Sequence, residues 1–304
     1  MKLARNNAFF AKKRSRFQKK LYLCSQIAKK RMQNDLVSVI MPTFDSGLKL
    51  ADSIDSILNQ TYRNLELIIT DDDSTDAKTL DILKRYSEQD ERVNVLFLEV
   101  NKGPGYARDR SIERARGRYI AFCDSDDKWY PEKLERQIAF MNEKQCVLSY
   151  TSYIIIDNDD RETGIVIAPP SMSFRQLKLD NQIGCLTAIY DTKLLGSKYF
   201  MPFIRKRQDW GLFLTILRDT GQKAYAIREP LAYYRDTKGS VSSNKLGLIK
   251  YNIRIYEKVL GFSHLKAVLY FYFLFTPAHI RKLIRKYWDS FLYVHGKGPY
   301  ANKR

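Results

Sequence analysis

Residues that build disulfide frameworks and zinc clusters are scarce in this sequence. It has four cysteines and three histidines among 304 residues. The cysteines are widely spaced and form neither a CxxC pair nor a mixed Cys/His metal pattern: Cys24, Cys123, Cys146 and Cys185. The spacing argues against a disulfide-stabilised secreted domain and a structural zinc site, so we predict reduced thiols, as in a cytosolic protein.

Long apolar runs are also missing. The run at residues 267–278 is apolar and aromatic but only 12 residues long, whereas a helix needs about 20 residues to span a bilayer. The basic N-terminus is not followed by the apolar core of a signal peptide. We therefore expect neither a membrane-spanning helix nor a secretory leader. The content of 44% hydrophobic and 28% charged residues is typical of a globular protein.

The net charge of +18 is concentrated at the two ends of the chain. Residues 1–35 and residues 245–304 each carry a net charge of +10, whereas residues 36–244 carry −2. We predict a basic helical extension over 1–35, a nearly neutral domain over 36–244 and a basic aromatic helical tail over 245–304. Charge placed in this way concerns where a protein binds more than the chemistry that it performs.

Strand-like and helix-like segments alternate from residue 36 onward. The strand-like runs of the first half are 36–41, 65–70, 93–98 and 119–123. This alternation predicts an α/β fold with a mostly parallel central sheet and helices on both faces. In the less regular second half, strand patterns cover 146–168 and 185–190, and helical patterns cover 171–181 and 208–220.

Capping residues predict where several helices begin and end. Asp76 is a predicted N-cap, and Pro104 is a predicted first residue of the next helix. Gly117 and Gly221 are predicted to follow helix C-termini, where glycine is favoured.

Three acidic groups follow predicted strands: Asp45, Asp71–Asp73 and Asp124–Asp127. Because ligands bind beyond the carboxyl ends of strands in such sheets, we expect these groups along one rim. Asp124 and Asp126 can face one divalent cation, and Mg²⁺ or Mn²⁺ prefers oxygen ligands that it shares with phosphate. The alternative is a structural acidic turn in which Asp127 caps the next helix.

Two further acidic positions each have two interpretations. A carboxylate of Asp71–Asp76 could accept a hydrogen bond from a nucleotide base or ribose, or the run could form only a turn and an N-cap. Asp209 opens a predicted helix, where the helix dipole favours a carboxylate. The same side chain could instead act as a general base toward an acceptor hydroxyl.

Four segments, taken in order, resemble one enzyme family. They are Val39–Asp45, Asp71–Asp76, Asn101–Asp109 and Gly117–Trp129. Together they are similar to the family 2 inverting glycosyltransferases, which have the GT-A fold and use nucleotide-diphosphate sugars. The resemblance covers residues 36–244 and implies a nucleotide-binding half (36–127) and an acceptor-binding half (128–244).

The resemblance implies a nucleotide pocket built from the first half. Pro42, Phe44 and Asp45 would contribute to the pocket for the base and ribose. Asp72 would hydrogen-bond to the base, most often uracil, and Arg108 would border the nucleotide.

The remaining matches concern the reaction itself. Asp124, Ser125 and Asp126 match the Asp-x-Asp motif that holds the metal and the diphosphate, with Asp126 as the more direct metal ligand. Asp209 matches the catalytic base. The implied reaction is the metal-assisted transfer of one sugar with inversion, with Mg²⁺ or Mn²⁺ as cofactor. The implied partners are a nucleotide-sugar donor, with a UDP-sugar as the expected one, and a glycan or lipid-linked acceptor.

Several positions depart from the family pattern. Asp73 replaces the usual glycine, Asp45 and Asp109 stand where asparagine is usual, Gln208 replaces a glutamate, and Thr237 replaces a histidine that some members use on the metal. Tyr234–Arg235 and Ser240–Ser242 match the loop that closes over the diphosphate. These departures keep open a catalytically silent nucleotide-sugar-binding or scaffold protein on the same fold. The Gln-x-x-Arg-Trp signature of processive synthases is absent, which favours a single sugar transfer.

The basic, aromatic tails have two interpretations. They could pack onto the catalytic domain with their Lys and Arg side chains in solvent, or they could lie on an anionic membrane surface. Many bacterial members of the family act on lipid-linked acceptors. The resemblance therefore favours a cytoplasmic protein that is peripheral at the inner face of the cell membrane. Nucleic-acid binding is not expected, because no RNA- or DNA-binding motif is present.

Overall fold

The computed structural model describes residues 35–237 and 246–301. The chain divides into two units, residues 1–35 and residues 36–304. Residues 1–34 of the predicted basic extension, with Cys24, lie outside the described residues, as do the predicted loop residues Ser240–Ser242.

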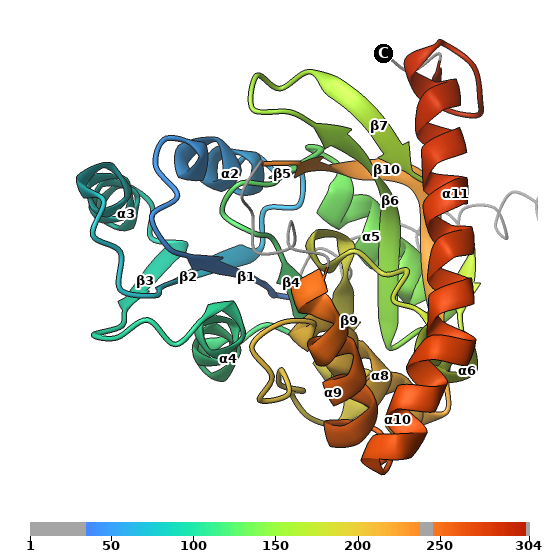
Figure 1. The fold of residues 1–304 in the computed structure, drawn as a ribbon. Coiled ribbons are helices and arrows are strands. Elements are labelled where there is room, and N and C mark those ends of the chain that lie inside the picture. Colours follow the sequence, from blue (N-terminus) through green and yellow to red (C-terminus); the bar gives the residue numbers. More distant parts are fainter. Residues whose placement is uncertain (1–34, 238–245, 302–304) are drawn as a thin grey trace, which may run out of the picture. The chain divides into compact units, whose positions relative to one another are not determined.

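The described residues form one ten-stranded sheet in the order β3-β2-β1-β4-β9-β6-β10-β5, with β7 beside β6 and β8 beside β10 (Figure 1). The strands are β1 (Val37–Thr43), β2 (Leu65–Asp71), β3 (Val93–Phe97), β4 (Tyr119–Phe122), β5 (Lys128–Trp129), β6 (Leu148–Ile156), β7 (Glu162–Val166), β8 (Ser171–Met172), β9 (Ile189–Asp191) and β10 (Ala224–Arg235).

The sheet has a parallel half and a mixed half. Strands β3, β2, β1 and β4 are parallel, and β1 lies between β2 and β4. Strand β9 is antiparallel to both β4 and β6, so it joins the parallel half to the parallel pair β6–β10. The predicted α/β fold with a mostly parallel sheet is confirmed.

Helices cover both faces of the sheet. They are α2 (Lys49–Leu58), α3 (Ala77–Gln89), α4 (Pro104–Arg114), α5 (Lys133–Lys144), α6 (Phe174–Leu179), α7 (Thr192–Leu195), α8 (Gln208–Thr220), α9 (Ile249–Lys258), α10 (His264–Tyr270) and α11 (Thr276–Val294). Short 3₁₀ turns occur at η1 (Cys185–Thr187) and η2 (Leu246–Leu248), and η3 (Phe271–Phe275) is π-helical.

The alternation of side chains along β1 explains this layering. Val39 and Met41 pack in one apolar cluster with α2, α3 and α5, whereas Ile40 points the other way into a cluster with α4 and α8. Figure 1 shows α2 and α3 on one side of β1–β3 and α4 on the other. A strand that is apolar on both faces therefore fits a sheet covered on both sides.

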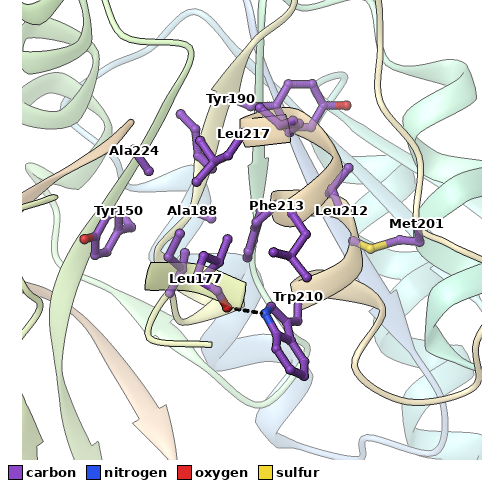
Figure 2. Packing of buried hydrophobic residues seen from close by; sticks show 14 of the residues in the cluster. Tyr150, Leu177, Ala188, Tyr190, Met201, Trp210, Leu212, Phe213, Leu217 and Ala224 are labelled. Atoms are coloured by element: carbon purple, nitrogen blue, oxygen red, sulfur yellow. Dashed lines mark hydrogen bonds between the residues drawn. The ribbon is translucent and has the colours of Figure 1, made fainter. Parts of the chain in front are cut away.

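The core beneath α8 fixes the start of that helix. Trp210 is 1% exposed, and its indole Nε1 donates a hydrogen bond to the Leu177 carbonyl at 2.8 Å (Figure 2). Its ring also packs near Tyr256 of α9 and Phe275 of η3. A buried indole with a satisfied N–H has a fixed position, so the backbone of the preceding residue, Asp209, is held in place.

Three predicted helix ends are confirmed. Pro104 is the first residue of α4. The Asp76 carboxylate accepts the backbone N–H of Thr79 at the start of α3. Gly221 ends α8 with a φ of +64°, a conformation that costs glycine little.

Two local predictions are wrong. Helix α4 ends at Arg114, and Gly117 does not have the left-handed conformation of a helix-ending glycine. Gly117 is needed for close approach instead, because a Cβ there would lie 2.6 Å from the backbone N of Ser38. The predicted strand at 185–190 begins with the turn η1, and β9 starts only at Ile189.

The described part of the predicted C-terminal tail is helical and packs against the sheet. Ile255, Phe271 and Phe275 are buried in the same cluster as α8. Further along, the Ser290 hydroxyl of α11 bonds both the N–H and the carbonyl of Ile165 in β7, at 3.1 Å each. Within residues 35–237 and 246–301, no helix has the length and apolar character that crossing a membrane requires.

Candidate active site

The acidic groups that follow β1 and β2 meet at one rim, as their positions in neighbouring parallel strands require. One carboxylate oxygen of Asp45 accepts the backbone N–H groups of Thr75 and Asp76, each at 2.8 Å. The Asp45 N–H in turn donates to the Ser74 hydroxyl at 2.9 Å. Asp73, which replaces the family's usual glycine, has a φ of +67°, a conformation that glycine adopts without strain.

A chain of hydroxyl groups connects the end of β1 to the Asp-x-Asp turn after β4. Ser46 Oγ lies 2.9 Å from Thr43 Oγ1 and 2.6 Å from Ser125 Oγ. Of the two predicted pocket residues on this segment, Pro42 is buried, whereas Phe44 is 50% exposed. Phe44 therefore has ring surface available to a ligand. The contact of the buried Pro42 with a nucleotide stays a prediction.

Asp72 holds the loop that leads into α4. The side chain is 3% exposed, and its two oxygens accept the backbone N–H groups of Lys102 at 2.9 Å and Gly103 at 2.7 Å. This arrangement fixes the loop beside the predicted nucleotide pocket. The bond from Asp72 to a base stays a prediction.

The Asp-x-Asp turn concentrates negative charge around one arginine. Arg108 of α4 is 7% exposed and forms an ion pair with Asp124. Burial and the neighbouring Asp124 carboxylate raise the pKa of Asp126 to about 6. Two carboxylates this close repel each other in their charged forms, so the turn favours a bound cation.

Asp127 does not cap the next helix, so the prediction of a helix cap at this residue is wrong. Glu132 is the residue that precedes α5, and the 1% exposed Asp127 side chain accepts the backbone N–H of Arg235 at 2.9 Å. Burial, reinforced by Asp126 and Asp124, raises the pKa of Asp127 well above its usual range. The carboxyl thus ties the turn to β10.

Arg235 of β10 bonds both to the Asp-x-Asp turn and to the loop at residues 157–160. It is 2% exposed, and its guanidinium donates to the Asp126 carbonyl at 3.0 Å and to the Asp157 carbonyl at 2.8 Å. It also lies 2.5 Å from a carboxylate oxygen of Asp160. Thr237, at the place of the family histidine, donates a long hydrogen bond of 3.4 Å to Asn158.

Asp209 lies near the start of α8, where Asn181 Nδ2 donates to its Oδ2 at 3.0 Å. The preceding residue, Gln208, is 5% exposed and packs against Gly105, where a Cβ would lie 2.8 Å from Gln208 Cγ. The start of α8 is therefore in contact with the start of α4.

The charge of Arg108 is favoured both by the Asp-x-Asp turn and by the candidate base, Asp209. Burial opposes the charge on Arg108, but Asp124 and also Asp209 favour it and raise the pKa of the guanidinium. The half-buried thiol of Cys185 responds to the same groups, although burial dominates and raises its pKa. Residues from both halves of the chain therefore surround one site.

Sequence reasoning missed Asn181 and Cys185. Neither residue belongs to a spaced pattern, and each reaches the site only through the tertiary fold. The acidic Asp180 next to Asn181 marks a loop position but not its contact with Asp209.

The Asp-x-Asp turn offers carboxylate oxygens, the ligands that Mg²⁺ and Mn²⁺ prefer. The described parts of the chain hold no group of three or more His, Cys, Asp or Glu side chains placed to bind a metal. The Asp124–Asp126 pair fits a cation that completes its shell with diphosphate oxygens and water, as Mg²⁺ commonly does. The raised pKa of Asp126 fits the same conclusion.

A hollow of about 320 Å³ is lined by other residues. It is lined by Asp52, Asp55, Ser56, Asn59, Lys128, Trp129, Pro131 and Asp160. None of the predicted site residues lines it, so the candidate site rests on the convergence of side chains at the rim.

Comparisons with solved structures agree with this architecture. S. aureus TarS (residues 1–349, in complex with UDP-GlcNAc) superposes with a TM-score of 0.61 at 21% identity, covering 81% of this chain and 72% of TarS. The mannosyltransferase PcManGT from Pyrobaculum calidifontis, in complex with GDP-Man and Mn²⁺, gives a TM-score of 0.59 at 14% identity, covering 86% and 80%. These likenesses establish the GT-A-like fold.

Sequence comparisons identify the family. The model of glycosyl transferase family 2 matches residues 38–197. TuaG of Bacillus subtilis (strain 168), named as a teichuronic acid biosynthesis glycosyltransferase, is 41% identical over 233 residues, which are 76% of this chain and 91% of TuaG. The Escherichia coli UDP-Glc:alpha-D-GlcNAc-diphosphoundecaprenol beta-1,3-glucosyltransferase WfgD is 38% identical over 219 residues, 72% of this chain and 84% of WfgD. The chain therefore belongs to glycosyl transferase family 2 and is an enzyme of this class.

Proposed function

We propose that the enzyme transfers one sugar from a UDP-sugar to a lipid-linked glycan acceptor in bacterial polysaccharide biosynthesis, with inversion at the sugar carbon. The observation that carries the proposal is the grouping of Asp124, Asp126, Arg108 and Asp209 around one site. Such a grouping offers a place for a metal diphosphate on one side and a base on the other.

The donor is proposed to bind the half formed by residues 36–127. Phe44 offers an exposed ring to the base or ribose, and Asp72 holds the adjoining loop. The names of WfgD and of the TarS complex both include a UDP-sugar, which supports uridine as the base. Residues 128–244 would then form the acceptor-binding half.

The diphosphate is proposed to bind with Mg²⁺ or Mn²⁺ at Asp124 and Asp126, beside Ser125. When bound, the metal would neutralise the charge that develops on the leaving diphosphate. Arg108 lies 7% exposed beside this turn, and its Nε has no hydrogen-bond partner among the described residues. A phosphate oxygen is an acceptor that would satisfy such a donor.

Asp209 is proposed to take the proton of the acceptor hydroxyl as that hydroxyl attacks the sugar carbon. The attack comes from the side opposite the diphosphate, so the bond to the acceptor forms as the bond to the diphosphate breaks, which inverts the centre. Asn181 holds one Asp209 oxygen in place at 3.0 Å. An oriented carboxylate loses less freedom on reaching the transition state.

The relatives support a proposal for the acceptor class and for the location. The name of WfgD specifies a diphosphoundecaprenol acceptor, which is a membrane lipid, and we propose an acceptor of the same class here. A membrane-bound acceptor favours peripheral contact of the basic tails with the cytoplasmic face of the membrane. This contact is part of the proposal.

The test is a panel of UDP-sugars with Mg²⁺ or Mn²⁺, scored for sugar transfer and for release of UDP. Asp209→Asn should keep donor binding and lower turnover by about 10²–10⁴-fold, the usual contribution of a general base. Asp219→Asn, an acidic residue near the other end of α8, is the matched control and should stay near the wild-type rate. Near-normal turnover of Asp209→Asn would refute the assignment of the base. Donor binding without transfer from any sugar would instead favour the silent binding protein.

A further inference from the structure

Residues 264–294 form a continuous helical segment made of α10, η3 and α11, and this segment has two apolar faces. One face packs on the core through Ala267, Phe271, Phe275 and Tyr293, each at most 8% exposed. The other face carries large apolar side chains that are 42–73% exposed: Leu269, Phe273, Ile280, Ile284, Tyr287 and Phe291. We call this second face the exposed stripe.

The spacing of the exposed stripe distinguishes it from scattered surface residues. Its members follow one another at intervals of four, seven, four, three and four residues, so they lie along one side of the helix. Single exposed apolar side chains are common on protein surfaces. A contiguous apolar surface of this length instead marks a site of interaction.

The charges around the exposed stripe indicate the partner. Residues 264–294 contain five Lys or Arg and one acid, Asp289. Lys282 turns inward to Asp180, at 3.0 Å, and the other four cations of the segment are Lys266, Arg281, Arg285 and Lys286. An amphipathic helix with aromatic side chains on one face and cations beside them fits the interface of an anionic bilayer.

We propose that the exposed stripe docks in the plane of an anionic lipid bilayer, with its apolar side chains at the boundary between headgroups and acyl chains. Docking of this kind differs from attraction by basic tails alone, because buried apolar area persists when salt screens the charges. The partner is the lipid surface itself, and the inference does not depend on the reaction that the enzyme performs.

The packed face of the same helix leads to the candidate base. Lys282 Nζ donates to the Asn181 carbonyl at 2.5 Å, and Asn181 in turn donates to Asp209. Docking of α11 would therefore bring the bilayer near the loop that holds Asp209, where a lipid-linked acceptor would arrive. This consequence alone rests on the proposed function.

The chain carries its own reporter for the experiment. Of its three tryptophans, Trp129 and Trp210 are 3% and 1% exposed, whereas Trp288 of α11 is 56% exposed. The full-length protein is mixed with phosphatidylcholine vesicles with and without phosphatidylglycerol. We expect a blue shift of tryptophan emission, quenching by brominated lipids, and co-flotation that persists in part at about 0.5 M salt, where charges are screened.

Matched variants connect the signal to the exposed stripe. Leu269→Glu and Ile284→Glu should each weaken vesicle binding by about tenfold or more, because each removes one apolar side chain from the interface. Leu194→Glu on α7 is the control, since Leu194 is 40% exposed and Leu269 is 48% exposed. Circular dichroism and UDP release with a water-soluble acceptor check that each variant is folded.

Several outcomes would overturn the proposal. One is flotation that vanishes completely at high salt with no shift in Trp288 emission, which would assign binding to basic charge alone. Another is self-association in analytical ultracentrifugation that Ile284→Glu abolishes, without vesicle binding, which would assign the stripe to a second copy of the chain. Docking without sugar transfer would contradict the proposed function and leave this inference standing.

Discussion

Acidic side chains at the rim crowd one another, whereas Asp180 beneath α11 faces a lysine ammonium and a histidine ring. At the rim, burial and neighbouring carboxylates raise the pKa values of Asp126 and Asp127. Beneath α11, burial opposes the charge of Asp180, but the His279 ring and the Lys282 ammonium outweigh it and hold its pKa below the usual range. The carboxylates at the rim repel one another, and a bound cation would relieve this repulsion. The Asp180 carboxylate already has a cationic partner, Lys282.

The largest effect is expected at the rim. Asp126→Asn should lower sugar transfer by about 10²–10³-fold, the range found when one electrostatic contact to a reacting group is removed. The same change should raise stability at pH 7 by about 1 kcal/mol in EDTA, because it removes a carboxylate whose charge is unfavourable there. Transfer assays and thermal denaturation in EDTA measure the two effects. A variant that loses both activity and stability would contradict the view of the rim as a strained binding site.

Beneath α11 the expected change in stability has the opposite sign. Asp180→Ala should lower the free energy of unfolding by about 3 kcal/mol, because it leaves Lys282 partly buried without its carboxylate. Since the pKa of Asp180 is lowered in the folded state, its contribution is present above about pH 4 and is lost as pH falls through the folded value.

Urea denaturation at pH 7 and at about pH 3 tests this expectation, since the difference between wild type and variant should shrink at the lower pH. Asp219→Ala is the control, because its exposed ion pair with Arg218 should contribute less than about 1 kcal/mol. Equal losses of stability in Asp180→Ala and Asp219→Ala would contradict the expected difference between the two carboxylates.

Asn181 connects the two regions, and its effect should fall on turnover. Asn181→Ala should lower kcat by about tenfold and leave the donor KM nearly unchanged, because it removes a hydrogen bond to the charged Asp209 carboxylate. Gln182→Ala is the control, since its amide oxygen accepts from Arg285 instead, at 2.5 Å. A rise in donor KM with unchanged kcat would place Asn181 in donor binding.

The smallest effect is expected at Phe44. Phe44→Ala should weaken donor binding by about two- to tenfold, the value of one aromatic contact, with little change in stability because the ring is 50% exposed. Phe97→Ala, at a position that is 51% exposed, should leave donor binding unchanged. Isothermal titration calorimetry with UDP measures the binding of both variants. Equal effects in the two variants would remove Phe44 from the pocket.

The first half of the fold could be predicted because its signals are local. The four parallel strands are short apolar runs with turn residues after them, and the Asp76 cap is encoded within four residues. Their shared rim follows from parallel pairing alone. Helical periodicity and a final glycine also sufficed to predict the bounds of α8, Gln208–Thr220.

The rest depends on partners far apart in the sequence. Asp127 resembles a helix cap locally, yet its hydrogen-bond partner Arg235 lies 108 residues further on. Gly117 resembles a helix end, and only the approach of β1 explains it. The aromatic run at 267–278 is apolar on both sides, so no periodicity could tell which side packs on the core and which side faces outward.

The contact between Gly105 and Gln208 limits how this enzyme can evolve. A Cβ at position 105 would lie 2.8 Å from Gln208 Cγ, which is closer than carbon atoms in proteins approach. An ancestor or a variant with a larger residue at 105 must therefore shorten or redirect the side chain at 208, next to the candidate base. The two positions should change together across evolution, and attempts to broaden acceptor choice by redesign should treat them as one unit.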